Sequence, residues 1–318
     1  MKTLDDFDRL ELGIFPTPLY KLENLSRLTG RNIYVKRDDM TGVALGGNKV
    51  RKLEYLLADA KRHGAQVVIT TGGAQSNHAM LTAACCNRVG LTPLLVLKAP
   101  LNTPKRGNLI LNDILGARVH LVEADGYDAV YSEIGRIVNK LRSFGQEPYT
   151  IPVGGSVPLG SLGYVRCVRE IAEQARAMDV RIDHIVCTAG SGGTHAGVAL
   201  GSQIYLGSKV TGIAVSGDDF VPIVRELIKD TAALLGKMTD ITPNVFNYMG
   251  AGYAIPSAQG SAAIRTVAKA EGLILDPVYT GKCMAGMLDL IKKGYFAPEE
   301  NILFLHTGGA GGVFAIDV

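Results

Sequence analysis

The stretch HIVCTAGSGGTHAG, residues 184–197, passes from a short apolar run through a glycine-rich turn into the start of a helical pattern. The same succession occurs twice more, in TTGGAQSNHAM (70–80) and HTGGAGGVFA (306–315). Ligands of parallel α/β sheets gather beyond the carboxyl ends of the strands, where turns of this kind lie. Three such turns therefore predict one shared binding site.

Short apolar runs alternate with helical patterns along nearly the whole chain, which is typical of an α/β fold with a largely parallel sheet. No linker or low-complexity tract divides the chain, so composition alone places no domain boundary. The predicted strands are 32–37, 66–72, 93–98, 118–123, 148–153, 184–190, 209–216 and 301–307. The predicted helices are 48–63, 76–89, 105–115, 127–144, 161–178, 194–206, 219–235, 257–271 and 282–293.

The composition is that of an ordinary globular protein. Of the 318 residues, 47% are apolar and 20% are charged, and this length allows two lobes or one large α/β domain. The 33 basic residues are balanced by 30 acidic ones and form no basic run, so we expect no nucleic-acid partner. No run approaches the roughly 18 apolar residues of a membrane span, so we expect no membrane partner.

The N-terminal segment and the cysteines favour a cytoplasmic protein. The segment MKTLDDFDRLELGIFPTPLY (1–20) has acids where a signal peptide has cations, and it lacks an apolar core. The five cysteines form no CxxC pair and are odd in number, which fits reduced thiols. We expect no metal site.

The turn at residues 190–194 has the composition of an anion site. Its three glycines free the backbone amides to face an anion, and its serine and threonine add hydroxyl donors at a helix N-terminus. The Lys-Ser/Thr ending of a P-loop is absent, and His195 stands where the dinucleotide fingerprint needs glycine. A tight turn without a ligand is the alternative interpretation, with His195 an ordinary helix residue.

The turn GGAQSNHA (72–79) offers Gln75, Ser76, Asn77 and His78 beside free backbone amides, with no carboxylate nearby. Such a set would bind a carboxylate or a phenolic oxygen. Alternatively, Ser76 or Asn77 caps the following helix, and both roles are compatible. Ser76 and His78 do not resemble a hydrolase pair, since residues two apart on a helix do not face each other.

Three cations, Lys49, Arg51 and Lys52, occupy the first turn of the helix that follows GGN at 46–48. A helix N-terminus carries partial positive charge and favours acidic residues instead. A lysine is a nucleophile only when its amine is neutral, and nearby cations and a helix N-terminus both disfavour the ammonium form. We therefore expect Arg51, Lys52 and the helix end to lower the pKa of Lys49. The alternative is an ordinary solvated lysine.

Two tyrosines stand in loops that carry other chemically useful residues. Tyr253 lies in GAGYAIPS (250–257), and Tyr279 and Thr280 lie in DPVYTGKCMAG (276–286), just before a helix. Each tyrosine is a candidate proton donor, with a place in the core or at a rim as the alternative.

Taken together, the motifs closely resemble the D-cysteine desulfhydrase and 1-aminocyclopropane-1-carboxylate deaminase family. These are pyridoxal-phosphate enzymes of the tryptophan-synthase-β type of fold (fold type II). As a set, GNK with RDD upstream and SGGT downstream is specific. The motifs are PTPL (16–19), VKRDDMTGVALGGNKVRKLEY (35–55), QSNH (75–78), GSGGTHAG (190–197), DPVYTGK (276–282) and LHTGG (305–309).

The resemblance implies roles for individual residues. Lys49 would hold the cofactor covalently and, once released by substrate, move the Cα proton. Asn77 would donate to the phenolic oxygen of the cofactor, Ser76 would receive the substrate carboxylate, and Tyr253 and Tyr279 would line the reaction face. The implied cofactor-binding residues also include Lys52, Gly190, Ser191, Gly192, Gly193, Thr194, Thr280 and Thr307. The implied substrate-binding residues are Gln75, Ser76, Asn77 and His78.

The resemblance also implies an architecture. Residues 52–155 would form a small domain inserted into a large cofactor-binding domain made of residues 1–51 and 156–318. Closure of the two domains would exclude water from the reacting carbon. A homodimer is expected, because family members commonly form dimers.

Thr280 and Thr307 match the desulfhydrase pattern, because the deaminases have glutamate and leucine at these positions. A carboxylate at the pyridine nitrogen keeps that nitrogen protonated and makes the ring a strong electron sink, whereas a hydroxyl does so weakly. Opening a cyclopropane ring needs the stronger sink. Elimination from cysteine needs less, because thiolate is a good leaving group. We therefore expect a lyase that converts D-cysteine to pyruvate, ammonia and hydrogen sulfide.

Four alternatives stay open. Two are enzymes of the same kind: a 1-aminocyclopropane-1-carboxylate deaminase, or a β-elimination lyase for a related substrate such as L-cysteate. A third is a catalytically silent ligand-binding relative. The fourth, a nicotinamide-dependent dehydrogenase, would use the turn at 190–194 with Asp218 downstream, but it leaves Lys49 unexplained.

Overall fold

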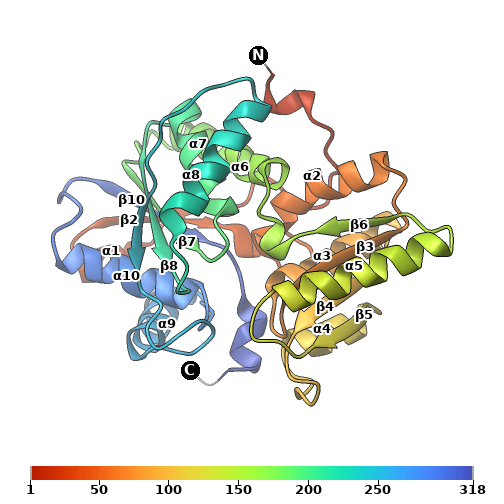
Figure 1. The fold of residues 1–318 in the computed structure, drawn as a ribbon. Coiled ribbons are helices and arrows are strands. Elements are labelled where there is room, and N and C mark those ends of the chain that lie inside the picture. The colour runs from red at the N-terminus through yellow and green to blue at the C-terminus, as the bar shows by residue number, and fades with distance from the viewer. Residues whose placement is uncertain (1, 317–318) are drawn as a thin grey trace.

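The chain folds around two separate β-sheets, shown in Figure 1 as a computed structural model that describes residues 2–316. Strand pairs are parallel in both sheets, apart from the antiparallel pair of β1 and β2. The larger sheet has the order β1 (Leu19–Lys21), β2 (Asn32–Arg37), β10 (Asn301–His306), β7 (His184–Ala189), β8 (Lys209–Ala214) and β9 (Asn244–Asn247). The smaller has the order β5 (Arg118–Val122), β4 (Thr92–Lys98), β3 (Val67–Gly73) and β6 (Pro148–Ile151). The predicted α/β fold is confirmed.

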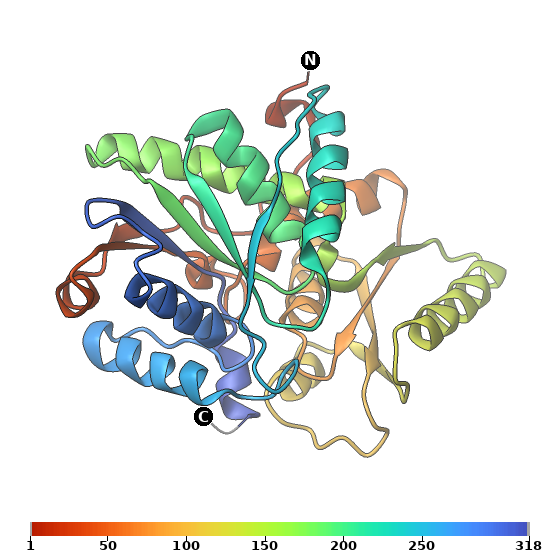
Figure 2. The same cartoon turned by 60° about the vertical axis from the view of Figure 1, so that its left-hand side comes forward.

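Helices cover both faces of each sheet. On the large sheet, α1 (Glu23–Thr29), α9 (Ala258–Glu271) and α10 (Thr280–Lys292) pack on one face, and α6 (Pro158–Ala177), α7 (Gly193–Tyr205) and α8 (Phe220–Leu234) on the other. On the small sheet, α2 (Lys49–Arg62), α3 (Asn77–Val89) and α4 (Asn108–Ile114) lie opposite α5 (Asp128–Ser143), which Figure 2 shows on the side away from the large sheet. Short 3-10 segments are η1 (Leu4–Asp6), η2 (Asp38–Met40), η3 (Val153–Gly155) and η4 (Ala310–Phe314). None of the helices within residues 2–316 is long and apolar enough to cross a membrane.

The alternation of side chains along β2 shows why two helical layers are needed. Ile33 and Val35 point into the cluster formed with α1, α9 and α10, whereas Tyr34 points into the cluster formed with α6 and α7. Successive strand residues face opposite sides of a sheet, so a strand that is apolar on both sides must be covered on both.

All eight predicted strands and all nine predicted helices are present, with ends that differ by a few residues. The sequence missed β1, β9 and α1, which are only three, four and seven residues long. The helix predicted from residue 282 begins two residues earlier, at Thr280. The buried Asp276 carboxylate accepts hydrogen bonds from the amides of Val278, Tyr279 and Thr280 and so caps this earlier start.

Helix α2 connects the two halves of the molecule, because it packs against α3 on the small-sheet side and against α6 on the large-sheet side. A Cβ atom on Gly163 of α6 would lie 2.3 Å from the carbonyl oxygen of Arg51, so glycine is required where the two helices approach. The strands of the small sheet all fall within residues 52–155 and those of the large sheet outside them. The predicted domain boundaries themselves stay a prediction.

Candidate active site

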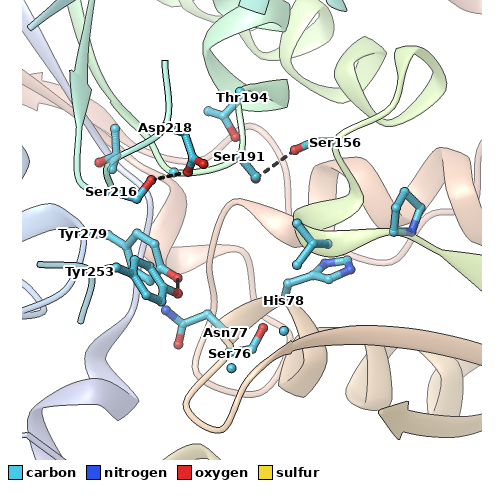
Figure 3. A pocket seen from close by; sticks show the side chains of 18 of the residues that line it. Ser76, Asn77, His78, Ser156, Ser191, Thr194, Ser216, Asp218, Tyr253 and Tyr279 are labelled. Carbon is cyan, nitrogen blue, oxygen red and sulfur yellow. Dashed lines mark hydrogen bonds between the residues drawn. The ribbon is translucent and has the colours of Figure 1, made fainter. Parts of the chain in front are cut away.

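One cavity of about 640 Å³ lies between the two sheets and is lined by all three glycine-rich turns. Ser76 and Asn77 follow β3, Ser191 and Thr194 follow β7, and Thr307 follows β10. Figure 3 shows Ser76 and Asn77 across from Ser191 and Thr194, with the tyrosine pair on one side. The prediction of a single shared site at the strand ends is therefore confirmed.

Lys49 is the first residue of α2 and its side chain lines the cavity. Within residues 2–316, its amine has neither a hydrogen-bond acceptor nor an acidic partner. Burial lowers the pKa of Lys49 to about 8, because the ammonium form loses its hydration. A neutral amine is therefore accessible near physiological pH.

The predicted cause of this pKa shift is wrong, because burial lowers the pKa of Lys49 and neither Arg51 nor Lys52 contributes to the shift. The Arg51 guanidinium is neutralised by the buried carboxylate of Asp38, at 2.7 and 2.8 Å, and by Glu170 at 2.9 Å. Arg51 in turn holds the pKa of Asp38 below its usual value despite burial. One of the three cations is thus part of an internal ion-pair network, and only Lys49 and Lys52 remain near the cavity.

Lys52 lies beside the turn between β7 and α7. Its Nζ donates to the carbonyl oxygen of Gly154 at 3.1 Å and to Ser156 Oγ at 3.2 Å. Burial and repulsion from Lys49 lower the pKa of Lys52 well below its ordinary value. A Cβ atom on Gly193 would lie 2.9 Å from Lys52 Nζ, so the glycine lets this amine reach the start of α7.

The N-terminus of α7 has free donors that suit an anion. Gly192 adopts φ 84° before the first helical residue and, as a glycine, has no side chain to cap the helix. Ser156 Oγ accepts from the Gly193 amide at 3.2 Å and lies 2.9 Å from Ser191 Oγ. Thr194 Oγ1 accepts from Asn48 Nδ2 at 3.0 Å, which leaves its hydroxyl proton free to donate. This donor set, with no carboxylate in it, fits a phosphate.

Ser156 is a site residue that the sequence analysis missed. It follows the two glycines of η3 and connects Lys52 to the Gly193 amide, although it is far from both in sequence. The pair of glycines ahead of it was a signal of close backbone approach.

The turn after β3 caps its helix and also faces the cavity, while its predicted ligand contacts stay a prediction. Ser76 Oγ accepts from the Ala79 amide at 3.1 Å and so caps α3, while Ser76 also lines the cavity. His78 lines the cavity too, with Nε2 2.8 Å from Thr70 Oγ1, and burial followed by repulsion from the two lysines lowers its pKa well below the usual value.

Gln75 does not line the cavity. Its Nε2 donates to the Arg106 carbonyl oxygen at 2.9 Å, and its Oε1 accepts from the Asn108 amide at 2.8 Å. The predicted contact of Gln75 with substrate therefore has no support in this arrangement and stays a prediction.

Tyr253 and Tyr279 meet at the opposite side of the cavity, where their hydroxyl groups form a hydrogen bond (Figure 3). Their rings pack edge to face with centroids 6.0 Å apart. Burial raises the pKa of both tyrosines, and the neighbouring Tyr253 raises that of Tyr279 further. Both hydroxyl groups therefore keep their protons at neutral pH, and one of these protons forms the bond between them.

Thr280 and Thr307 were both predicted to bind the cofactor, but only Thr307 lines the cavity. The Thr280 hydroxyl donates to Asp276 Oδ1 and accepts from the Asp276 amide, both at 2.7 Å. Its only proton is thus committed within the α10 cap, and its predicted contact with the cofactor stays a prediction.

These residues fit a phosphorylated aldehyde of the kind expected from the sequence. Lys49 offers an amine without a partner, and the start of α7 offers a set of donors in which a Cβ at residue 193 would collide with Lys52. Lys49 and the start of α7 line the same continuous cavity.

Comparisons with known proteins agree with this assignment. Residues 10–308 match the sequence model of the family described as pyridoxal-phosphate dependent enzyme. A D-cysteine desulfhydrase of Yersinia pestis is 43% identical over 323 residues, which cover 98% of this chain and 97% of that protein. A protein of Pyrococcus horikoshii, whose name provisionally gives it as a 1-aminocyclopropane-1-carboxylate deaminase, is 44% identical over 316 residues, with 98% and 94% covered.

Solved structures show the same likeness. The crystal structure of an ACC deaminase homologue superposes with a TM-score of 0.92 at 43% identity and covers 98% of this chain and 95% of its own. The processed form of threonine deaminase isoform 2 from Solanum lycopersicum has a TM-score of 0.68 at 22% identity, covering 97% and 81%, and shares the fold.

Proposed function

The chain belongs to the pyridoxal-phosphate dependent enzyme family, and from that premise we propose that it is a lyase that eliminates the β-substituent of D-cysteine, giving pyruvate, ammonia and hydrogen sulfide. The cofactor is pyridoxal 5'-phosphate. The substrate is proposed from the relatives that carry the desulfhydrase name and from the residues that line the cavity.

We assign the cofactor-holding roles as follows. Lys49 binds the aldehyde carbon, and Lys52, Ser156 and the turn at 190–194 hold the phosphate. Asn77 donates to the phenolic oxygen. Bound in this way, pyridoxal phosphate supplies an electron sink that stabilises negative charge at the substrate Cα.

The other residues act on the substrate directly. Ser76, at the start of α3, receives the substrate carboxylate. Lys49 would take the Cα proton as a neutral amine, which its lowered pKa of about 8 favours. The β-carbon–sulfur bond would break with its electron pair on sulfur, and Tyr279, whose hydroxyl bonds that of Tyr253, would supply a proton to the sulfur. One water molecule would then hydrolyse the remaining carbon–nitrogen bond and give pyruvate and ammonia.

One observation favours elimination over ring opening: the candidate positions for the pyridine nitrogen carry hydroxyl groups. Thr307 lines the cavity, as do the aspartates Asp125 and Asp218, but no glutamate of the described chain does so. A hydroxyl is a poor substitute for a carboxylate in keeping a ring nitrogen protonated, so the cofactor has a weaker electron sink here. The cleavage of a bond to a good leaving group fits that weaker sink.

A substrate panel tests the proposal. Purified enzyme loaded with cofactor is assayed with D-cysteine, L-cysteine, L-cysteate, β-chloroalanine and 1-aminocyclopropane-1-carboxylate, and pyruvate, 2-oxobutyrate and sulfide are measured. We expect pyruvate and sulfide in equal amounts from D-cysteine. Formation of 2-oxobutyrate without sulfide would establish the deaminase instead, and turnover of L-cysteate alone would establish that relative. A protein that binds cofactor but turns over none of these would be the silent relative.

We also propose a homodimer in the cytoplasm, with the domain boundaries given above. The dimer is supported by the fact that family members commonly form dimers, and sedimentation equilibrium tests it. The cytoplasmic location is supported by the five cysteines, which are all buried and unpaired, as is usual in a reducing compartment.

A further inference from the structure

Asn108, which lies outside the cavity, holds the side chain of Asn77. Asn108 Nδ2 donates to the backbone carbonyl of Gln75 at 2.9 Å and to Asn77 Oδ1 at 2.7 Å. The first bond fixes which end of the Asn108 amide is nitrogen, because a carbonyl oxygen only accepts. The atom that Asn108 meets on Asn77 must therefore be an acceptor, which is the side-chain oxygen.

This bond leaves the Asn77 nitrogen for the cavity. Figure 3 shows the Asn77 nitrogen directed toward the tyrosine pair and the oxygen directed away from it. Nothing within residues 2–316 accepts a hydrogen bond from Asn77 Nδ2. A side-chain amide nitrogen has two protons and can only donate, so this group suits an acceptor oxygen on a ligand.

Asn108 is itself locked in place. Its side chain is fully buried, and its backbone amide donates to Gln75 Oε1, whose orientation is fixed by the bond from Gln75 Nε2 to the Arg106 carbonyl. On the other side, a Cβ atom on Gly311 would lie 2.4 Å from Asn108 Oδ1, so η4 closes directly over the amide. Turning the Asn108 amide over would set its oxygen against the Gln75 carbonyl.

We infer that Asn108 is a positioning residue, which orients the Asn77 amide so that it donates to the phenolic oxygen of the cofactor. The inference rests on the proposed function for the identity of that oxygen. Without Asn108, the Asn77 amide is free to turn over and present its own oxygen to the cofactor. Gln75 is part of the same hydrogen-bond network, which explains why its side chain faces α4 and not the cavity.

The test compares Asn108→Ala with Asn112→Ala in cofactor-free protein. Asn112 is an equally buried asparagine on the same helix, and its side-chain nitrogen and oxygen have no hydrogen-bond partner within the described chain. Dissociation constants are measured for pyridoxal phosphate and for its 3-deoxy analogue, which lacks the phenolic oxygen. Thermal unfolding without ligand reports on the fold.

We expect Asn108→Ala to weaken pyridoxal phosphate about tenfold, the loss of about one hydrogen bond, and to leave the 3-deoxy analogue within about twofold of wild type. Asn112→Ala should change neither constant. Equal losses for both ligands, or the same loss in Asn112→Ala, would overturn the inference. Unchanged binding in Asn108→Ala would overturn this inference but not the proposed function. A wild-type protein that binds no pyridoxal phosphate would overturn both.

Asn77→Asp gives a second test that does not disturb the packing of α4. Its carboxylate still accepts from Asn108 but replaces the cavity-facing nitrogen with oxygen. We expect the unfolding temperature to be retained, pyridoxal phosphate to bind more than tenfold more weakly and the 3-deoxy analogue to be affected less. The opposite amide orientation would reverse this result, with lower stability and unchanged discrimination between the two ligands.

Discussion

Arg51 and Asp38 form a double hydrogen bond in the interior of the protein, with Nε 2.7 Å from Oδ2 and Nη2 2.8 Å from Oδ1. The two side chains are 3% and 0% exposed. Arg51 lies two residues after Lys49 in the first turn of α2, and Asp38 begins η2 at the end of β2. The pair therefore anchors the turn that carries the reactive amine to the large sheet.

Asp38→Asn should destabilise the protein by about 3–5 kcal/mol, because it leaves a buried guanidinium with only part of its compensating charge. Denaturant unfolding of the cofactor-free protein measures this. Arg62→Ala is the control on the same helix, since its ion pair with Asp59 is at the surface and should have no measurable effect. A small loss in Asp38→Asn would show that Glu170 alone neutralises Arg51.

The lowered pKa of Lys49 predicts how cofactor capture depends on pH. The neutral amine attacks the aldehyde, so the capture rate should rise about tenfold per pH unit below the pKa of about 8 and become level above it. A solvated lysine would still be accelerating up to about pH 10. Stopped-flow absorbance of cofactor-free protein mixed with pyridoxal phosphate gives this profile.

Lys49→Ala is the control for that experiment and should show no covalent absorbance change at any pH. Borohydride reduction of the loaded wild type, followed by peptide mapping, should place the label on Lys49. A label on Lys52 instead would contradict the assignment.

The helix at 49–62 and its reactive lysine were predictable from the sequence, but the ion-pair partners of Arg51 in its first turn were not. Local periodicity and glycine-rich turns are encoded within a few residues, which is why the strands, the helices and the convergence of the three turns were predicted. The partners of Arg51 are 13 and 119 residues away along the chain, so no local pattern reveals that its charge is neutralised. The same reason hid Ser156, which meets Gly193 across 37 residues.

Glycines were the signal that the sequence analysis used too narrowly. Gly193 and Gly163 allow a lysine amine and a helix backbone to approach closely. Gly193 was predicted only to turn its amide toward an anion, and Gly163 only to lie within a helix. Likewise, Thr280 was assigned from its position in a motif, whereas its bonding partner, Asp276, lies in the same motif and was visible.

The tyrosine pair should be needed for turnover more than for binding. Tyr279→Phe removes a hydroxyl whose raised pKa keeps it protonated, and should lower kcat by about 100-fold or more if it supplies a proton. Tyr253→Phe should have a smaller effect, because that side chain is 43% exposed and water can replace its hydroxyl. Steady-state kinetics with D-cysteine separates kcat from KM.

Tyr295→Phe is a suitable control for the tyrosine variants, since its hydroxyl accepts from Asn244 in an aromatic cluster away from the cavity. It should leave kcat unchanged. Equal kcat values in Tyr279→Phe and wild type would show that Tyr279 transfers no proton and only lines the cavity.

Ser156→Ala should weaken the binding of the cofactor phosphate. Its hydroxyl receives hydrogen bonds from Lys52 and from the Gly193 amide, so it holds two donors in place beside the anion site. We expect the dissociation constant for pyridoxal phosphate to rise about tenfold, while that for pyridoxal, which has no phosphate, stays within about twofold. Ser161→Ala is the matched control, because Ser161 is a buried serine of α6 whose hydroxyl has no partner within residues 2–316. Two outcomes would contradict this role: an equal loss of affinity in both variants, or an equal loss of affinity for pyridoxal and pyridoxal phosphate. Ser156 would then stabilise the junction of η3 and α6 and would not contribute to phosphate binding.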